Sequence, residues 1–175
     1  IVPRGGGTNI VGACIPCDSL VIDMKKMRKV SNFDPITKTI RTEIGITIKE
    51  LNEKLKSIGF EFPVYSNSES TIGGMIAIND IGYLGRYGHI KNWVEEIEFV
   101  NGRGESIRVG KVDISDICGM EGTTGIIIKA KLKVIPLKKR TASVYQSDKI
   151  EEILAIGKKL NLEREIAMLR FYSPI

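Results

Sequence analysis

The sequence predicts an α+β fold, because strand signals and helix signals alternate along its 175 residues. A helix is indicated after Thr47, where apolar residues recur at helical spacing until Gly59. Two hairpins are indicated by β-rich segments that flank turn-forming dipeptides, at residues 30–43 around Asp34-Pro35 and at 93–109 around Asn101-Gly102. Hydrophobic residues make up 42% of the chain, which is enough to give these elements a common core.

Two helices are predicted in the first half of the chain. Thr47 is the predicted N-cap of the first, whose apolar positions are Ile48, Leu51, Leu55 and Ile58. Thr71 is the predicted N-cap of the second, with Gly73-Gly74 in its first turn. Each glycine there costs about 1 kcal/mol of helix stability, so the pair indicates that something approaches the backbone closely. Residues 80–92 are rich in Gly and Tyr and are predicted to form a loop.

Two further strands are predicted from β-branched segments. The first, at residues 19–23, is short. The second, at 126–134, begins with three isoleucines and then alternates, which indicates that its first half is buried on both faces. Pro136 ends this strand.

The character of the chain changes at Thr141. Residues 143–146 and 166–172 are predicted strands, and 147–160 are a predicted helix. We therefore predict a boundary near residues 136–142, which separates a domain over 1–137 from the beginning of another over 141–175.

The charge of the chain is mildly basic. There are 26 Lys and Arg against 21 Asp and Glu, a net charge of +5. The basic residues are scattered and aromatic residues make up only 6%, which argues against nucleic-acid binding and fits a weak bias toward an anionic ligand. No segment is typical of a signal peptide or a membrane-spanning helix, so we expect no integral membrane span and a cytoplasmic location. Because the chain starts at Ile1 inside a predicted strand, we expect a fragment or a natural short form.

The three cysteines do not indicate a metal site. Cys14 and Cys17 have the spacing of redox motifs and of half a zinc site, but only Cys118 and His89 remain to complete a ligand set. We expect no bound metal. A reversible disulfide stays open, and the simplest interpretation is two small apolar residues that line a loop.

Three glycine-bearing loops, at residues 5–9, 73–74 and 122–125, each adjoin a predicted strand or helix start. Consecutive glycines allow backbone N–H groups to converge on an anion, and a helix N-terminus adds donors. None of the loops has the spacing of a Rossmann fingerprint or a P-loop. Several loops that converge would suit an extended dinucleotide. Taken alone, the loop at 5–9 fits a flexible surface loop or a cloning remnant equally well.

Five motifs recur in an order that one family shares: Pro-Arg-Gly-Gly-Gly-Thr (3–8), Ser-Thr-Ile-Gly-Gly-Met (70–75), Asn79, Arg-Tyr-Gly (86–88) and Glu-Gly-Thr-Thr-Gly-Ile (121–126). With them the chain resembles the FAD-binding domain of the vanillyl-alcohol oxidase and p-cresol methylhydroxylase superfamily, closest to its glycolate oxidase flavoprotein subunit and D-lactate dehydrogenase branch. The resemblance implies two α/β subdomains with FAD between them. It also implies that the first subdomain lacks its amino-terminal strands, and that residues 141–175 open a substrate-covering domain as a β-α-β unit.

The resemblance also implies which residues bind the cofactor. The phosphates would be held by Gly5, Gly6, Gly7, Thr8 and Asn9. Their other side would be closed by Ser70, Thr71, Gly73 and Gly74. Pro63 and Asn79 would lie toward the flavin ring. The ribose and adenine would be bordered, largely through backbone groups, by Glu121, Gly122, Gly125 and Ile127. Covalent attachment in the superfamily often uses a histidine in the first loop; Thr8 stands there, so we expect non-covalent FAD.

The implied activity is oxidation of a small 2-hydroxy acid, such as glycolate or D-lactate, by hydride transfer to the flavin. The acid–base groups of such enzymes lie in the covering domain, so we name no catalytic residue, and a partner subunit or electron acceptor is compatible with the sequence. His89 is expected to be exposed rather than catalytic. Two alternatives stay open: a non-catalytic FAD-binding or electron-transfer subunit, and a degenerate domain without cofactor. The second is favoured by Asp80 and Ile81, a charge and a bulky side chain where the family has small residues near the flavin.

Overall fold

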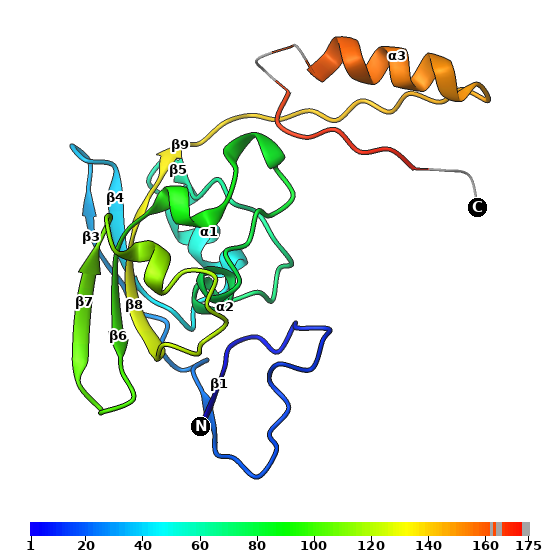
Figure 1. The fold of residues 1–175 in the computed structure, drawn as a ribbon. Helices are drawn as coiled ribbons and strands as arrows, with labels where there is room; N and C mark the ends of the chain where they lie inside the picture. Colours follow the sequence, from blue (N-terminus) through cyan, green and yellow to red (C-terminus); the bar gives the residue numbers. More distant parts are fainter. Residues whose placement is uncertain (162, 164–165, 173–175) are drawn as a thin grey trace.

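The computed structural model describes residues 1–161, 163 and 166–172, and it combines helices and sheets as predicted (Figure 1). Its centre is an antiparallel sheet of five strands in the order β3-β4-β8-β6-β7. These strands are β3 (Val30–Asp34), β4 (Thr39–Glu43), β6 (Val94–Val100), β7 (Ser106–Gly110) and β8 (Ile126–Lys133). Helices α1 (Ile48–Lys56) and α2 (Ile72–Ala77) cover one face of the sheet, and the core lies between.

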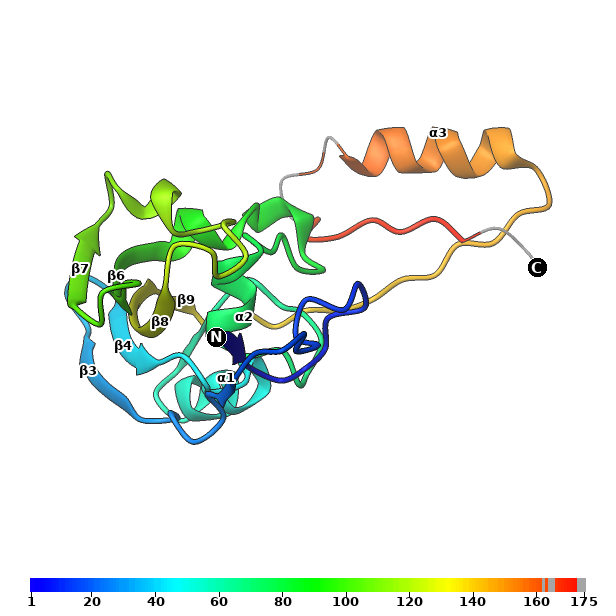
Figure 2. The ribbon, with the colours of Figure 1, turned by 60° about the horizontal axis from the view of Figure 1, so that its bottom comes forward.

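Smaller elements surround this centre. In one two-stranded sheet β1 (Val2–Arg4) runs parallel to β2 (Val21–Asp23), and in the other β5 (Phe60–Glu61) runs antiparallel to β9 (Ile135–Pro136). Figure 2 shows β1 at the end of the molecule where α1 and α2 lie. Three 3₁₀ turns are η1 (Gly85–Tyr87), η2 (Ile90–Trp93) and η3 (Ile114–Asp116). Helix α3 (Ile150–Asn161) stands apart from the sheet (Figure 1). None of the described helices is long and apolar enough to cross a membrane.

Both predicted hairpins are confirmed, and each turn is closed by one short polar side chain. Asp34 Oδ1 accepts from the backbone N–H of Ile36 at 2.9 Å. Asn101 Oδ1 accepts from Arg103 N at 2.9 Å and from Glu105 N at 3.1 Å. These are the local bonds by which Asp and Asn favour turns.

Helix α1 begins as predicted but ends early. Thr47 Oγ1 accepts from Glu50 N at 3.1 Å and Glu50 Oε2 accepts from Thr47 N at 3.0 Å, which is a capping box. The helix then ends in two hydrogen bonds that span three residues instead of four, from Ile58 N to Leu55 O and from Gly59 N to Lys56 O. These bonds turn Ile58 outward, where it is 44% exposed, so its predicted place on the apolar face is wrong.

The predicted strands at 143–146 and 166–172 are not formed, while the helix predicted between them is present as α3. A strand needs a neighbour for its backbone hydrogen bonds, and neither segment pairs with another among the described residues. Alternation alone therefore did not produce strands; Val144 is 93% exposed and Tyr172 81% exposed. Residues 162, 164–165 and 173–175 of the predicted second domain lie outside the described residues.

A buried amide joins α1 to the segment that follows it. Asn52, 4% exposed, accepts from Phe62 N at 2.7 Å and donates to Phe62 O at 3.3 Å. We predict that Asn52→Ala lowers the free energy of unfolding by about 2–4 kcal/mol, because both backbone groups would be buried without partners. Urea denaturation measures this loss. The exposed neighbour Glu53 gives the control Glu53→Ala, which should change stability by less than about 0.5 kcal/mol; equal losses for the two variants would contradict the prediction.

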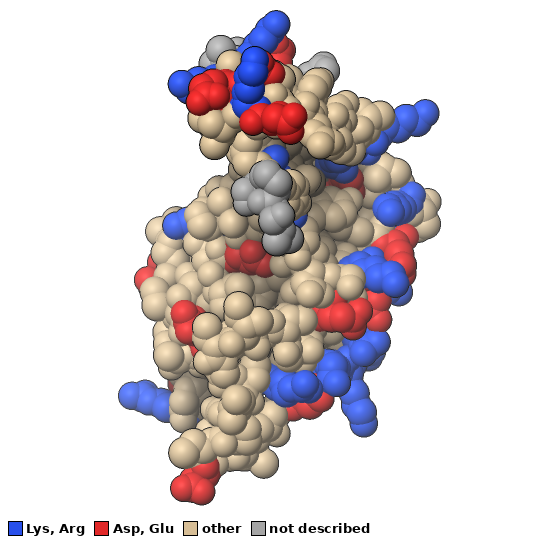
Figure 3. All heavy atoms as spheres, turned by 90° about the vertical axis from the view of Figure 1, so that its right-hand side faces the viewer, with Lys and Arg blue, Asp and Glu red and all other residues tan. Residues whose placement is uncertain are grey.

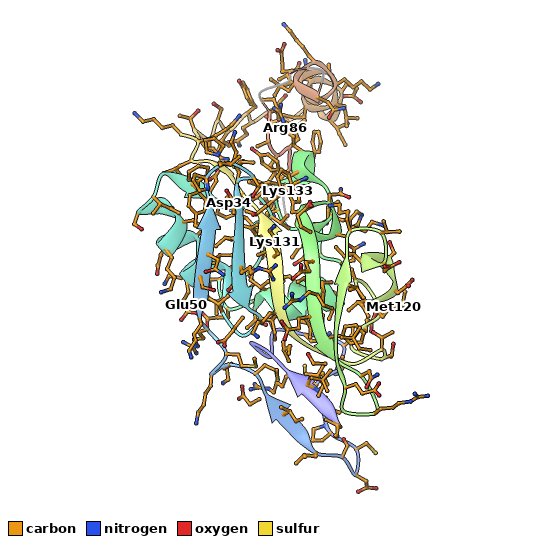
Figure 4. The ribbon with its side chains drawn as sticks, turned by 90° about the vertical axis from the view of Figure 1, so that its left-hand side faces the viewer. Asp34, Glu50, Arg86, Met120, Lys131 and Lys133 are labelled. Atoms are coloured by element: carbon orange, nitrogen blue, oxygen red, sulfur yellow. The ribbon has the colours of Figure 1, made fainter. Side chains whose placement is uncertain are left out.

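The face of the central sheet that α1 and α2 leave uncovered is charged, as Figure 4 shows for Lys131 and Lys133 on β8. On this face Glu96 receives a bidentate bond from Arg41 and lies 3.3 Å from Arg108. The hydrogen bond from Arg41 is the main reason why the pKa of Glu96 lies below its ordinary value.

This depressed pKa predicts an acid sensitivity of the fold. A carboxyl whose pKa is lower in the folded state stabilises the fold above its unfolded pKa, about 4.3, and the contribution disappears as the pH falls through the folded value. Glu96→Gln is expected to cost about 1 kcal/mol at neutral pH, with the difference from wild type shrinking toward zero in strong acid. Urea unfolding at several pH values would test this; a constant difference would contradict it.

Candidate functional site

The loop at residues 5–9 packs directly on the turn that precedes α2. A Cβ on Gly5 would overlap with Thr71 Oγ1, and one on Gly6 would overlap with the carbonyl oxygen of Glu69. Thr8 Oγ1 lies 3.3 Å from Ser70 Oγ. The first glycine loop therefore lies in contact with the turn that leads into Gly73-Gly74, more than sixty positions away in the chain. Only residues without a side chain permit this approach.

The third glycine loop reaches the other end of α2. Glu121 N donates to Ala77 O at 2.8 Å, and Gly119 N donates to Ile76 O at 3.1 Å. A Cβ on Gly122 would lie 3.4 Å from Pro3, next to the first loop. The three loops thus gather around α2 and the end of β1.

The free hydrogen-bond donors of the site come from the first loop. Within the described part of the chain, no backbone N–H of residues 5–9 donates to a protein acceptor. The Arg4 guanidinium folds back over this loop, at the place where a Cβ on Gly7 would sit, and Gly7 has φ +71°. Open N–H groups beside a guanidinium favour an anion. Arg4 was not among the predicted site residues; its place in the first motif was the available signal.

The start of α2 is already occupied by the protein itself. Ile72 N donates to Ile46 O, Gly73 N donates to Ile44 O and Gly74 N donates to Thr71 Oγ1. The close approach expected at the glycine pair is made at Gly73 by Ile44, whose Cδ1 would lie 2.7 Å from a Cβ there. Gly74 is exposed, so the outer surface of this turn is bare backbone.

Asn79, predicted to face the flavin ring, is held from three directions. It has φ +52°, and its Oδ1 accepts from Lys91 N at 3.4 Å and from the Cys118 thiol at 3.5 Å. His89 is exposed as predicted, with its Nδ1 2.9 Å from Asn79 O. Burial raises the pKa of Cys118 to about 11, so at neutral pH this thiol keeps the proton that it donates.

Asp80 and Ile81, the two residues that depart from the family pattern, lie in a turn that Asp80 itself stabilises. Asp80 Oδ1 accepts from Gly82 N at 2.7 Å, within its own turn. Ile81 is 46% exposed. The charge of Asp80 therefore serves the loop in which it stands.

The remaining predicted site residues differ in depth, from buried Pro63 to exposed Asn9. Pro63 is buried. Gly125 has φ +152°, and a Cβ there would overlap with Val100 O at the end of β6. The side chain of Ile127 belongs to the core, at 7% exposure, so a ligand would meet this residue only through its backbone. The side-chain oxygen of Asn9 accepts from Val11 N and Ala13 N, which leaves its amide group for other partners.

The sequence analysis missed a polar cluster that is centred on Glu61 of β5. Glu61 is fully buried, and the Arg140 guanidinium donates to both of its carboxylate oxygens. Tyr65 Oη also donates to Glu61 at 3.0 Å, and burial with this carboxylate raises the pKa of Tyr65 to about 12. The partners are 79 positions apart, so no local pattern could have signalled them.

Cys14 and Cys17, which follow the first loop, form no disulfide in the structure; Cys14 is half-buried and Cys17 is exposed. Across residues 1–161, 163 and 166–172, no three His, Cys, Asp or Glu side chains are grouped so that they could hold a metal ion.

Comparison with known proteins gives the family. Residues 1–110 match the family model described as FAD binding domain. Glycolate oxidase subunit GlcD of Bacillus subtilis is 32% identical over 163 residues, which are 84% of this chain and 35% of that protein. D-lactate dehydrogenase of Archaeoglobus fulgidus is 32% identical over 145 residues, 76% of this chain and 32% of that protein.

A solved structure agrees with these matches. Alkyldihydroxyacetonephosphate synthase superposes with a TM-score of 0.72 at 33% identity, over 77% of this chain and 27% of that one. The chain thus spans about a third of the length of the curated relatives it matches. The chain belongs to the FAD-binding domain family of oxidoreductases, in the superfamily of vanillyl-alcohol oxidase and p-cresol methylhydroxylase.

Proposed function

We propose that this chain is the FAD-holding part of an oxidoreductase that converts a small 2-hydroxy acid, such as glycolate or D-lactate, into its oxo acid. The observation that carries the proposal is the loop at residues 5–9. Its backbone N–H groups donate to no acceptor among the described residues and lie beside Arg4, while its glycines pack on the turn before α2. The substrate class is taken from the relatives named glycolate oxidase and D-lactate dehydrogenase.

The residues present fit a diphosphate. A Cβ at Gly7 would occupy the space of the Arg4 guanidinium, and Gly74, in the first turn of α2, is exposed. Two phosphate charges need several donors, and backbone N–H groups supply them without the entropy cost of ordering long side chains. In this proposal residues 5–9, Ser70, Thr71 and Gly74 hold the phosphates, and Gly73 contributes only by letting the turn lie close to β4. Because the first loop carries Thr8 where related proteins often carry the attached histidine, the cofactor is held non-covalently.

The chain's own residues bind and orient the cofactor in this proposal. When bound, FAD supplies a two-electron acceptor for the hydride of the acid. Asn79, fixed by Lys91, Cys118 and His89, sets the edge of the ring site. Glu121, Gly122, Gly125 and the backbone of Ile127 border the ribose and adenine.

A second candidate is an FAD-binding or electron-transfer subunit whose partner carries the active site. It is favoured by the makeup of the three glycine loops, which offer backbone donors and hydroxyls and, in the described residues, no histidine or lysine that could take the substrate proton. The degenerate-domain alternative stays open: Asp80 bonds within its own turn, and Ile81 is 46% exposed beside it.

Titration with FAD tests the proposals. The purified protein should bind FAD, with the bound flavin visible by absorbance and released by denaturation. Anaerobic addition of D-lactate or glycolate should bleach the flavin if the chain acts on the acid alone. Binding without bleaching would favour the second candidate, and no binding of FAD would overturn both.

A further inference from the structure

Arg140 lies in the segment that leads from β9 to α3. Helix α3 belongs to a lobe that stands above the body of the molecule in Figure 3. Among the described residues, the last backbone hydrogen bond between this segment and the body runs from Leu137 N to Gly59 O, at 2.9 Å. Between Leu137 and α3, the described hydrogen bonds that reach the body all come from the Arg140 guanidinium. This one side chain therefore fixes where the connecting segment leaves the body.

The main partner of Arg140 is a carboxylate that the fold buries completely. Glu61 is 0% exposed, and the guanidinium donates to its Oε2 at 2.7 Å and to its Oε1 at 2.5 Å. The guanidinium carbon also lies 5.6 Å from the ring centroid of Tyr65 and 5.9 Å from that of Tyr87. A buried ion pair adds little net stability compared with an apolar pair of similar volume, whereas a bidentate guanidinium against two rings allows one geometry. We therefore expect this cluster to serve position more than stability.

The first connection runs from Glu61 through Tyr65 to the loop at residues 80–84. Tyr65 Oη donates to Glu61 at 3.0 Å, and Tyr65 O accepts from Tyr83 N at 2.6 Å. A Cβ on Gly82 would lie 2.3 Å from the same carbonyl oxygen, so the loop packs directly on this backbone. The loop is thereby held against the segment that follows β5.

The second connection runs from Arg140 through Tyr87 to Asn79. The guanidinium donates to Tyr87 Oη at 3.4 Å. Trp93 Nε1 donates to Tyr87 O at 2.8 Å, and the two rings pack edge to face with their centroids 5.9 Å apart. Trp93 ends η2, and Lys91 of the same turn donates from its backbone N–H to Asn79 Oδ1 at 3.4 Å. Both connections therefore reach the part of the chain that begins at Asn79.

We propose that Arg140 is a positioning residue that fixes Asn79 through these two connections. Its effect on the flavin rests on the proposed function, which places Asn79 at the edge of the ring site, whereas the connection itself rests on the described contacts alone. In this scheme a displacement of the connecting segment moves Asn79. The lobe that carries α3 and the ring site are thus linked through one guanidinium.

The first test is made on the cofactor-free protein by NMR. Trp93 is the one tryptophan of the chain, so its indole N–H gives a single resonance, and the side-chain amide of Asn79 gives a second reporter. Arg140→Lys keeps the charge beside Glu61 but loses the planar fork, and it should shift both reporter resonances. Arg140 makes no hydrogen bond to either reporter among the described residues, so a shift measures transmission. Lys139→Leu, at the exposed neighbouring position, is the matched control and should shift neither.

Tyr87→Phe keeps the test decisive if Arg140→Lys does not fold. This variant removes only the hydroxyl that the guanidinium bonds, and it should shift the Asn79 amide in the same direction by less. The backbone N–H of Asn101, in the β6–β7 turn, should keep its resonance in every folded variant. The inference is overturned if the Asn79 amide in these variants stays where it is in Lys139→Leu.

The second test adds FAD and separates this inference from the proposed function. Arg140→Lys should bind FAD as wild type does, because the loop at 5–9 is untouched, while the absorption band and the midpoint potential of the bound flavin shift. FAD binding with an unshifted flavin would overturn the assignment of Arg140 to the ring site. Shifted reporter resonances without FAD binding to wild type would remove the proposed function and keep the connection to Asn79. FAD binding with unshifted reporter resonances would do the reverse.

Discussion

Gly6→Ala is expected to weaken FAD binding by at least about a hundredfold, which corresponds to about 3 kcal/mol. The added methyl group would overlap with the carbonyl oxygen of Glu69, a backbone atom that cannot rotate away. The loop at 5–9 must then move off the turn before α2, which displaces the open N–H groups of the loop. FAD titration by flavin fluorescence measures the loss.

The matched control is Gly102→Ala. Gly102 lies in the β6–β7 turn, where a Cβ would meet no atom within 4 Å. This variant should bind FAD as wild type does and unfold at a similar urea concentration. If Gly6→Ala also kept full affinity, the assignment of the phosphate site to this loop would be wrong.

Arg140→Leu is expected to lower the free energy of unfolding by about 3 kcal/mol. Glu61 is fully buried. Removal of its guanidinium partner leaves a carboxylate whose one remaining side-chain donor among the described residues is the Tyr65 hydroxyl. A lone buried charge costs about 3–5 kcal/mol; we take the low end because the Arg140 side chain is 29% exposed. Urea denaturation gives the value.

Two further variants separate charge loss from a general effect at this position. Lys139→Leu alters the exposed neighbour and should change stability by less than about 0.5 kcal/mol. The double variant Glu61→Leu/Arg140→Leu removes both charges and should recover part of the stability. If Arg140→Leu and Lys139→Leu behaved alike, the ion pair would not contribute as the structure implies.

Local signals in the sequence predicted most of the fold. Asp34 and Asn101 mark their turns, and Thr47 with Glu50 marks a helix start, because each acts on backbone groups within a few residues. The predictions of strands at 143–146 and 166–172 were wrong for the opposite reason. Whether a segment becomes a strand depends on a partner strand that lies elsewhere in the chain.

The candidate site was predictable only in part. That Gly5 lies near Thr71 could be expected from the order of motifs that the chain shares with the family. Neither loop taken alone predicts this contact. The glycine at 73 was correctly singled out as a close approach, but Ile44 rather than a ligand makes that approach. Glu61 and Arg140 could not be paired from sequence, because nothing near either residue indicates which of the many opposite charges in the chain is its partner.

The hydrogen bonds from Ile72 and Gly73 to the carbonyls of residues 46 and 44 make one wall of the site stiff before any ligand arrives. The loop at residues 5–9, whose amides donate to no acceptor among the described residues, lacks this support. Amide hydrogens at 72 and 73 should therefore exchange with solvent slowly in the empty protein, while those of residues 5–9 should exchange fast and become protected only on capture. Binding of the ligand would then order the loop at residues 5–9, which lies between β1 and β2, while the start of α2 stays as it is. The rate of binding would be set by this loop.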